Sequence, residues 1–177
     1  MIDRAFTPFP ILTTERLTLR QLAPGDVEAV FALRSDREIN KYLDRQPSKT
    51  LEDARDFIIK VSESIEKNEA IYWAVTMTES KAFAGAICLF GFSDSQGKCE
   101  IGYELSTSFQ GKGIMKEAAF KVIEYAIHTI KLEAIEALVH IDNEASIRLL
   151  EKLGFKKTIK TDKTISDCDI FELHANR

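Results

Sequence analysis

Residues 100–114 constrain the fold more than any other part of the chain. They predict a strand, then a sharp turn with two closely spaced glycines, Gly111 and Gly113, and then the start of a long helix. Glycine lets backbone N–H groups approach an anion without a Cβ in the way. A helix start adds unpaired N–H donors and the positive end of the helix dipole. The segment therefore predicts a binding site for a phosphate or pyrophosphate, with Lys112 nearby as a positive charge.

Two common phosphate-binding motifs do not fit this turn. The phosphate loop of nucleotide hydrolases requires G-x-x-x-x-G-K-[ST], and the dinucleotide fingerprint has three glycines. The sequence from Gln110 to Met115, QGKGIM, instead resembles the Q/R-x-x-G-x-G/A motif of the GCN5-related acetyltransferases, the GNAT family. In that family the motif holds the pyrophosphate of coenzyme A. The chain departs from it at Met115, where the family prefers a small residue; this side chain would either narrow the cofactor approach or point into the core.

Two further segments carry the same resemblance. Downstream, a strand-like segment leads into Asn143 as a helix cap, an amphipathic helix and a glycine stop. This order is similar to the N-x-x-S/A…K-x-G-F segment after the fifth GNAT strand. Upstream, residues 14–20 followed by Asp26 resemble the opening of the RimJ/RimL-type ribosomal-protein N-terminal acetyltransferases. The resemblance implies an α/β GNAT fold, a mixed central sheet flanked by helices, as one domain over residues 1–177 with its motif-bearing core at about 12–173.

Composition sets further limits. A chain of 177 residues suits a single domain. The net charge of −4 argues against a nucleic-acid-binding protein, which usually has a concentrated basic face. The three cysteines, Cys88, Cys99 and Cys168, are predicted to be reduced thiols, and no metal-ligand spacing is present. With neither an export signal nor an apolar run of the ~20 residues that span a membrane, we expect a cytoplasmic protein without membrane, metal or nucleic-acid contacts.

The remaining pattern predicts alternating strands and helices. Thr50 is expected to start a helix through a capping box, Asp26 to cap an earlier helix, and residues 35–49 to be irregular. The other predicted elements are strands at 17–20, 71–77, 81–90 and 136–141, a helix at 112–128, and a last hairpin at 156–159 and 170–173.

Acetyl transfer to an amine needs a base for the amine, donors for the developing oxyanion and a proton for the leaving thiolate. Strand alternation places Glu100 and Glu104 on one face. Glu100 matches the A-E-I position at which some GNAT members carry a general-base glutamate. Either carboxylate could instead act through water, attract a cationic acceptor, or be a solvated or paired side chain.

The resemblance also implies which residues meet the cofactor. In GNAT proteins a strand bulge before the turn offers backbone N–H groups, which here belong to residues around Leu105 and Ser106. The tyrosine that many members use to protonate the thiolate falls near Leu150, so it is absent, and Ser146 is the expected substitute. The implied cofactor-binding residues are Leu105, Ser106, Gln110, Gly111, Lys112, Gly113, Ile114 and Asn143.

We therefore expect an N-acetyltransferase that moves an acetyl group from acetyl-CoA to a primary amine, on a protein N-terminus or a small molecule, by direct attack in a ternary complex. A peptide α-amine of pKa ~8 would need less help from a base than a lysine near ~10.4. Acceptor-side candidates are Phe31, Asn40 and Tyr42, whereas His128 and His140 are expected to be structural. The alternatives are an acyl-CoA-binding domain without turnover and a purely structural α/β domain. A homodimer is possible.

Overall fold

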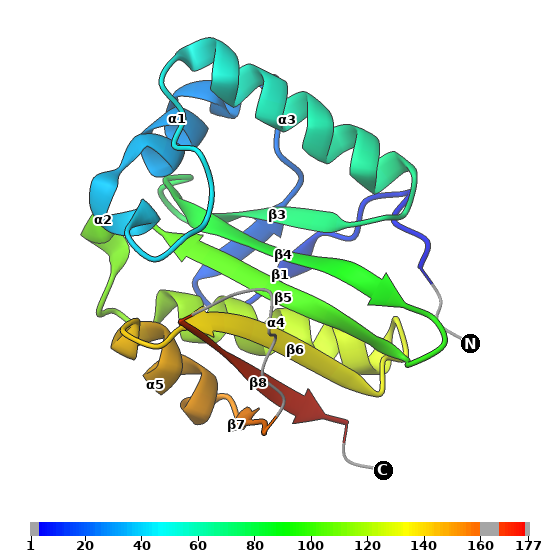
Figure 1. The fold of residues 1–177 in the computed structure, drawn as a ribbon. Coiled ribbons are helices and arrows are strands. Elements are labelled where there is room, and N and C mark those ends of the chain that lie inside the picture. Colours follow the sequence, from blue (N-terminus) through cyan, green and yellow to red (C-terminus); the bar gives the residue numbers. More distant parts are fainter. Residues whose placement is uncertain (1–3, 160–166, 176–177) are drawn as a thin grey trace.

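The computed structural model describes residues 4–159 and 167–175 (Figure 1). Its strands form one mixed sheet of eight, in the order β1-β2-β3-β4-β5-β6-β8-β7. Every neighbouring pair is antiparallel except β5 and β6, which are parallel. The strands are β1 (Leu12–Thr13), β2 (Leu17–Arg20), β3 (Ile71–Met77), β4 (Phe83–Ser93), β5 (Lys98–Leu105), β6 (Ala134–His140), β7 (Lys156–Lys157) and β8 (Cys168–His174). The helices are α1 (Val27–Ser35), α2 (Arg37–Asn40), α3 (Leu51–Glu66), α4 (Ile114–His128) and α5 (Glu144–Lys152).

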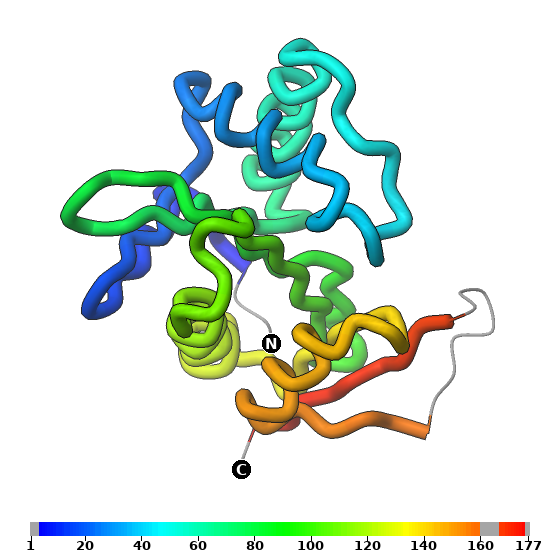
Figure 2. Tube along the Cα trace, turned by 90° about the vertical axis from the view of Figure 1, so that its left-hand side faces the viewer, coloured from blue at the N-terminus to red at the C-terminus, as the bar shows by residue number. Residues whose placement is uncertain are grey.

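The helices cover the sheet on both faces, with α1 to α3 on one side and α4 and α5 on the other (Figures 1 and 2). The alternation of β3 explains this arrangement. Trp73 and Val75 belong to a core shared with α4 and α5, whereas Ala74 packs with Val30 of α1 and Ile58 of α3. Because successive strand residues point to opposite faces, one strand supplies both cores. The two faces of the sheet are therefore covered by different helices.

Several predicted elements are confirmed. The strands at 17–20 and 71–77 have the predicted bounds, and β7 pairs with β8 as the final hairpin. Thr50 caps α3, since its hydroxyl accepts the Asp53 N–H and the Asp53 carboxylate accepts the Thr50 N–H. Helix α4 begins at Ile114 rather than at residue 112.

Asp26 occupies the predicted N-cap position of α1 but does not cap the helix with its side chain. The carboxylate instead accepts the Ala23 N–H at 2.8 Å and pairs with both terminal nitrogens of Arg20 at 2.8 and 2.9 Å. The expectation of an irregular 35–49 segment was also incomplete, because α2 forms there with Asp36 as its cap. Both differences arise because a short polar side chain can stabilise more than one local turn.

Strands β5 and β6 separate partway along their length (Figure 1). In the described residues their paired register covers only Lys98–Glu100 against Ala134–Glu136. The second half of β5, from Ile101 to Leu105, keeps β4 as a neighbour on one side and leaves β6 on the other. We call the space where the two strands part the β5/β6 opening. After Leu105 the chain continues through a short 3-10 helix, Thr107–Phe109, to the turn at Gly111 and Gly113.

Within the described residues, no helix is long and apolar enough to cross a membrane. In the same part of the chain, His, Cys, Asp and Glu side chains form no group of three that could hold a metal ion.

Candidate active site

The glycine turn has the conformation that the sequence predicts. Gly111 and Gly113 have φ values of 74° and 73°, a region that residues with a Cβ rarely adopt. A Cβ on Gly111 would meet nothing within 4 Å, so the backbone is open on that side. Gly113 is the N-cap of α4, and no side chain caps this helix. The first N–H groups of α4 are thus left for an anion, which fits the pyrophosphate of coenzyme A.

Arg16 lies beside this turn and was not singled out from the sequence. Its guanidinium donates to the Lys112 carbonyl at 3.0 Å and to the Glu117 carboxylate at 2.7 Å. Glu117 also accepts from the Thr14 hydroxyl and the Arg16 N–H. These contacts hold the first turn of α4 against the β1–β2 connection and place a second cation near the turn. A separation of 101 residues hides the pair from sequence reasoning.

The other predicted residues of the turn serve in different ways. The Lys112 ammonium donates to the Ser108 carbonyl at 2.8 Å, and the Gln110 amide donates to the Leu105 carbonyl at 3.0 Å. Ile114 is buried, so its backbone N–H rather than its side chain faces the turn. Met115 is only 6% exposed and packs in the core. Of the two alternatives for Met115, the core position is confirmed.

The expected bulge near Leu105 and Ser106 is absent from the described β4–β5 ladder. The register runs without a shift from Phe90–Glu100 to Gly85–Leu105, and the shift lies between Phe90 and Ser93. The Ser106 N–H donates to the Ala84 carbonyl at 2.8 Å, so the sheet already uses it. Hydrogen bonding alternates along an antiparallel ladder, which turns the Leu105 N–H toward the β5/β6 opening. Leu105 therefore remains a candidate oxyanion donor, and Ser106 does not.

A tyrosine lies where the sequence indicated none. The Tyr103 hydroxyl of β5 is 2.7 Å from the Ser146 hydroxyl of α5. The position near Leu150 could not supply this group, because Leu150 is 1% exposed and part of the core. Burial raises the pKa of Tyr103 to about 12, partly opposed by the hydrogen bond with Ser146. The hydroxyl is thus protonated at neutral pH and can give a proton.

Asn143 has the predicted capping role. Its side-chain oxygen accepts the Ser146 N–H at 3.2 Å. Ser146 is thereby fixed at its backbone by Asn143 and at its hydroxyl by Tyr103. This arrangement sets the start of α5 against the second half of β5.

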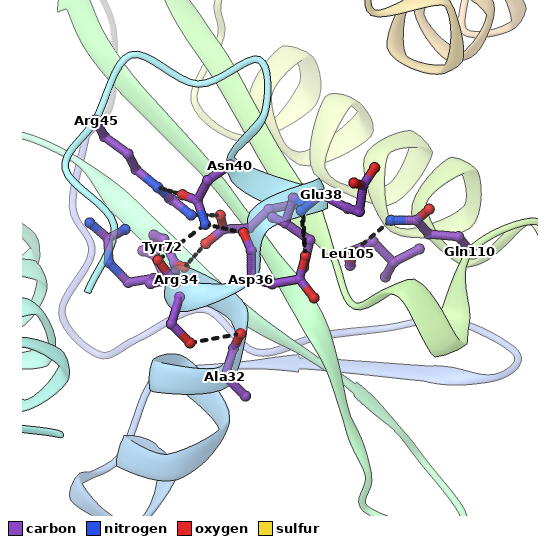
Figure 3. Close-up of polar contacts among 12 residues, drawn as sticks. Ala32, Arg34, Asp36, Glu38, Asn40, Arg45, Tyr72, Leu105 and Gln110 are labelled. Atoms are coloured by element: carbon purple, nitrogen blue, oxygen red, sulfur yellow. Dashed lines mark hydrogen bonds and ion pairs between the residues drawn. The ribbon is translucent and has the colours of Figure 1, made fainter. Parts of the chain in front are cut away.

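Glu104 occupies the opposite face of β5 and is only 8% exposed at its side chain. It forms an ion pair with Arg45 at 2.5 Å, and the Tyr72 hydroxyl lies 3.3 Å away (Figure 3). Burial and the Glu104 charge raise the pKa of Tyr72 well above its ordinary value. Of the readings that the sequence left open, that of a paired carboxylate is confirmed for Glu104.

Glu100 lies four residues before Glu104 and therefore on the same face of β5. Its carboxylate lies close to Gly91 of β4, because a Cβ on Gly91 would be 3.1 Å from one of its oxygens. A Cβ at position 91 would require this carboxylate to shift by a few tenths of an ångström, and the φ of 60° at Gly91 also favours glycine. A role of Glu100 as base stays a prediction.

The acceptor-side candidates separate into three environments. Phe31 packs into the core between α1 and α3. Asn40 holds the α1–α3 connection together, since its amide donates to the Arg34 and Asp36 carbonyls and its oxygen accepts from Arg45 (Figure 3). Tyr42 places its ring 5.3 Å from the ring of His140 at the end of β6. His140, which was expected to be structural, also accepts the Asp142 N–H at its Nδ1 at 3.2 Å.

The chain has the sequence pattern of a known acetyltransferase domain. The model of the acetyltransferase (GNAT) domain matches residues 16–156. The chain belongs to the GNAT acetyltransferase family. It is an acetyltransferase.

Individual GNAT relatives agree with this assignment. The chain is 35% identical over 149 residues to the uncharacterized N-acetyltransferase YoaA of Bacillus subtilis, covering 84% of each chain. Its fold matches that of RimL, a ribosomal-protein α-N-acetyltransferase solved with coenzyme A, with a TM-score of 0.84 at 18% identity over 93% of this chain and 98% of RimL. The microcin C7 self-immunity acetyltransferase MccE, solved with acetyl-CoA and AMP, gives a TM-score of 0.80 at 23% identity over 98% and 100%.

Proposed function

We propose that this GNAT protein transfers an acetyl group from acetyl-CoA to a primary amine by direct attack in a ternary complex. The observation that carries the proposal is the division of roles across β5. The protonated Tyr103 hydroxyl faces α5, whereas the Glu104 carboxylate faces α1 to α3, and both lie beside the β5/β6 opening. An acid for the leaving group and a carboxylate for the amine thus lie on opposite faces of one strand.

Acetyl-CoA, when bound, supplies a thioester carbonyl that an amine can attack. The N-terminus of α4 with Gly111 and Gly113 would hold its pyrophosphate, and Asn143 would contact the arm. The Leu105 N–H, which faces the opening, would stabilise negative charge on the carbonyl oxygen. Tyr103, oriented by Ser146, would donate its proton to the departing sulfur. Glu100 is the candidate base, and Glu104 would serve through its charge or through water.

The two cysteines near the site disfavour a two-step route through an acetylated thiol. Burial, with a further effect of Glu104, raises the pKa of Cys88 to about 12. Burial also raises the pKa of Cys99 far above its ordinary value. Because the thiolate is the nucleophile, neither thiol is activated at neutral pH. Direct attack by the amine is therefore favoured.

The acceptor class follows in part from the relatives. RimL is named for α-N-acetylation of a ribosomal protein, and MccE was solved with AMP beside acetyl-CoA. These names support an amine on either a protein N-terminus or a small molecule. A dimer and a cytoplasmic location remain predictions from the sequence.

The test is a titration of the protein with acetyl-CoA, followed by an assay of thiol release with peptides and small amines. We expect binding and amine-dependent release. Glu100→Gln should lower kcat most at low pH with little change in acetyl-CoA affinity, and Glu104→Gln serves as the matched carboxylate variant. Equal rates for Glu100→Gln and the wild-type protein across pH 6 to 9 would remove Glu100 as the base. Binding without release for any amine would favour the non-catalytic alternative.

A further inference from the structure

Two arginines share a partly buried position on the α1–α3 side of β5. Arg34 comes from the end of α1 and Arg45 from the connection between α2 and α3, and both side chains are drawn with Asn40 and Tyr72 in Figure 3. Arg45 is satisfied, since it donates to Asn40 at 2.6 Å and pairs with Glu104. Arg34 differs sharply from it.

The Arg34 guanidinium makes no hydrogen bond or ion pair within the described residues. Its Nε atom is fully buried and has no hydrogen-bond partner. Its planar group lies over the Phe57 ring, with 3.8 Å between Cζ and the ring centroid. Burial lowers the pKa of Arg34 and the charge of Arg45 lowers it further, while Glu104 and Tyr72 oppose this shift only in part. A cation held out of water beside another cation is costly unless an anion completes the site.

The charge balance points the same way. This cluster, consisting of Arg34, Arg45, Glu104 and Tyr72, has two guanidinium groups and one carboxylate. Tyr72 is neutral because its pKa is raised. The carboxylate of Asp36 accepts two backbone N–H groups at the start of α2 and, among the described residues, forms no ion pair with Arg34 or Arg45. The cluster therefore has an excess of one positive charge.

Building on the proposed function, we propose that this cluster selects an acceptor that carries a carboxylate close to its reactive amine, with Arg34 as the specificity-determining residue. A planar guanidinium binds a carboxylate through two parallel hydrogen bonds. Arg45 pairs with Glu104, and the next residue, Leu105, is the candidate oxyanion donor. An acceptor whose carboxylate binds near the arginines would therefore have its amine close to the reacting carbonyl. The carboxylate can belong to a free α-amino acid or to an acidic residue at a protein N-terminus.

The experiment compares matched acceptors by thiol release from acetyl-CoA. One arm uses free L-amino acids against the corresponding L-amino acid amides. The other uses amidated peptides that begin with Ser-Asp or Ser-Glu against those that begin with Ser-Asn or Ser-Gln. We expect kcat/KM for the carboxylate member of one arm to exceed that of its neutral partner by roughly tenfold or more, the size of one charged hydrogen-bond contact. The arm that shows the preference identifies the source of the carboxylate.

Variants separate recognition from folding. Arg34→Gln should reduce the carboxylate-to-amide ratio by about tenfold, and Arg34→Lys, which keeps the charge without the planar fork, should reduce it less. The control Arg37→Gln removes one positive charge from an exposed position three residues away and should leave the ratio unchanged. Thermal unfolding of each variant establishes that it is folded.

The possible failures are distinct. Equal rates for carboxylate and neutral acceptors in both arms, with thiol release intact, overturn this inference and leave the proposed function standing. An equal loss of the carboxylate preference in Arg34→Gln and Arg37→Gln would assign the preference to overall charge. That result also overturns this inference. Acetyl-CoA binding with no release for any acceptor overturns the proposed function, and this inference with it.

Discussion

The hydroxyl of Tyr103 in β5 lies 2.7 Å from the hydroxyl of Ser146 in α5, and this pair joins β5 to the helix that follows β6. The Asn143 cap holds the backbone of Ser146 at the same time. The family resemblance indicated that a tyrosine from a helix would protonate the thiolate. Here the tyrosine comes from a strand, and Ser146 orients its hydroxyl.

Removing the Tyr103 hydroxyl should slow transfer. Tyr103→Phe keeps the ring and loses the proton donor, so we expect kcat to fall by about 100- to 10,000-fold, the usual range for one general acid. Acetyl-CoA affinity should change much less, which a titration will show. Ser146→Ala keeps the Tyr103 hydroxyl but removes the partner that orients it, so it should give a smaller decrease in kcat. Wild-type kcat in Tyr103→Phe would exclude this tyrosine as the proton source.

The same group should make the protein sensitive to alkali. Burial raises the pKa of Tyr103 from 10.0 to about 12, so the folded state keeps a proton that the unfolded chain releases above pH 10. Stability contributed by this group is complete below pH 10 and is lost as the pH rises toward 12. Between pH 9 and pH 11 the loss is about 1 kcal/mol. Urea unfolding of Tyr103→Phe should lack this component, and identical pH dependence in both proteins would contradict the expectation.

The Arg45–Glu104 pair should contribute to stability. Glu104 is 8% and Arg45 22% exposed, so Arg45→Met would leave a nearly buried carboxylate without its cation. We expect the free energy of unfolding to fall by about 1–3 kcal/mol. Arg55→Met is the matched control, because Arg55 and Glu52 form an exposed pair at 53% and 68%, where the change should stay within about 0.5 kcal/mol. Equal effects in the two variants would show that burial does not matter here.

The glycine turn can be tested against a second glycine of similar geometry. Gly113 and Gly154 both have positive φ, 73° and 91°, and in each case a Cβ would have its nearest neighbour at 3.6 Å. Gly113→Val and Gly154→Val should each lose about 1–2 kcal/mol of stability from backbone strain. Only Gly113→Val should lose acetyl-CoA affinity in a titration, since Gly154 follows the end of α5 and is not part of the turn. Unchanged affinity in folded Gly113→Val would remove the turn from the cofactor site.

The Tyr42–His140 contact should affect the acceptor and not the cofactor. The rings are 5.3 Å apart and join the α2–α3 connection to the end of β6. Tyr42→Ala should raise the acceptor KM about two- to tenfold, the size of one aromatic pair, with acetyl-CoA affinity retained. Leu43→Ala, at the exposed neighbouring position, should leave the acceptor KM near its wild-type value. An increase in acetyl-CoA KM instead would place this contact on the cofactor side.

The local turns and helix caps, whose interacting residues are close along the chain, could be predicted from the sequence alone. The positive-φ glycines before α4, the Thr50–Asp53 capping box and the Asn143 cap all depend on neighbours within three or four positions. Their backbone geometry follows from residue type, so the pattern alone predicts them, and with them the pyrophosphate turn. The order of strands and helices, with the three separated motifs, then indicated the family.

Which distant side chains meet depends on the three-dimensional fold. Tyr103 and Ser146 are 43 positions apart, Arg45 and Glu104 are 59 apart, and Arg16 and Glu117 are 101 apart. Each pair forms because the sheet brings distant elements together, and no local preference specifies that contact. The parting of β5 from β6 likewise depends on long-range pairing. For this reason local pattern located the cofactor turn, whereas the proton donor, the paired state of Glu104 and the unpaired Arg34 emerged only from the fold.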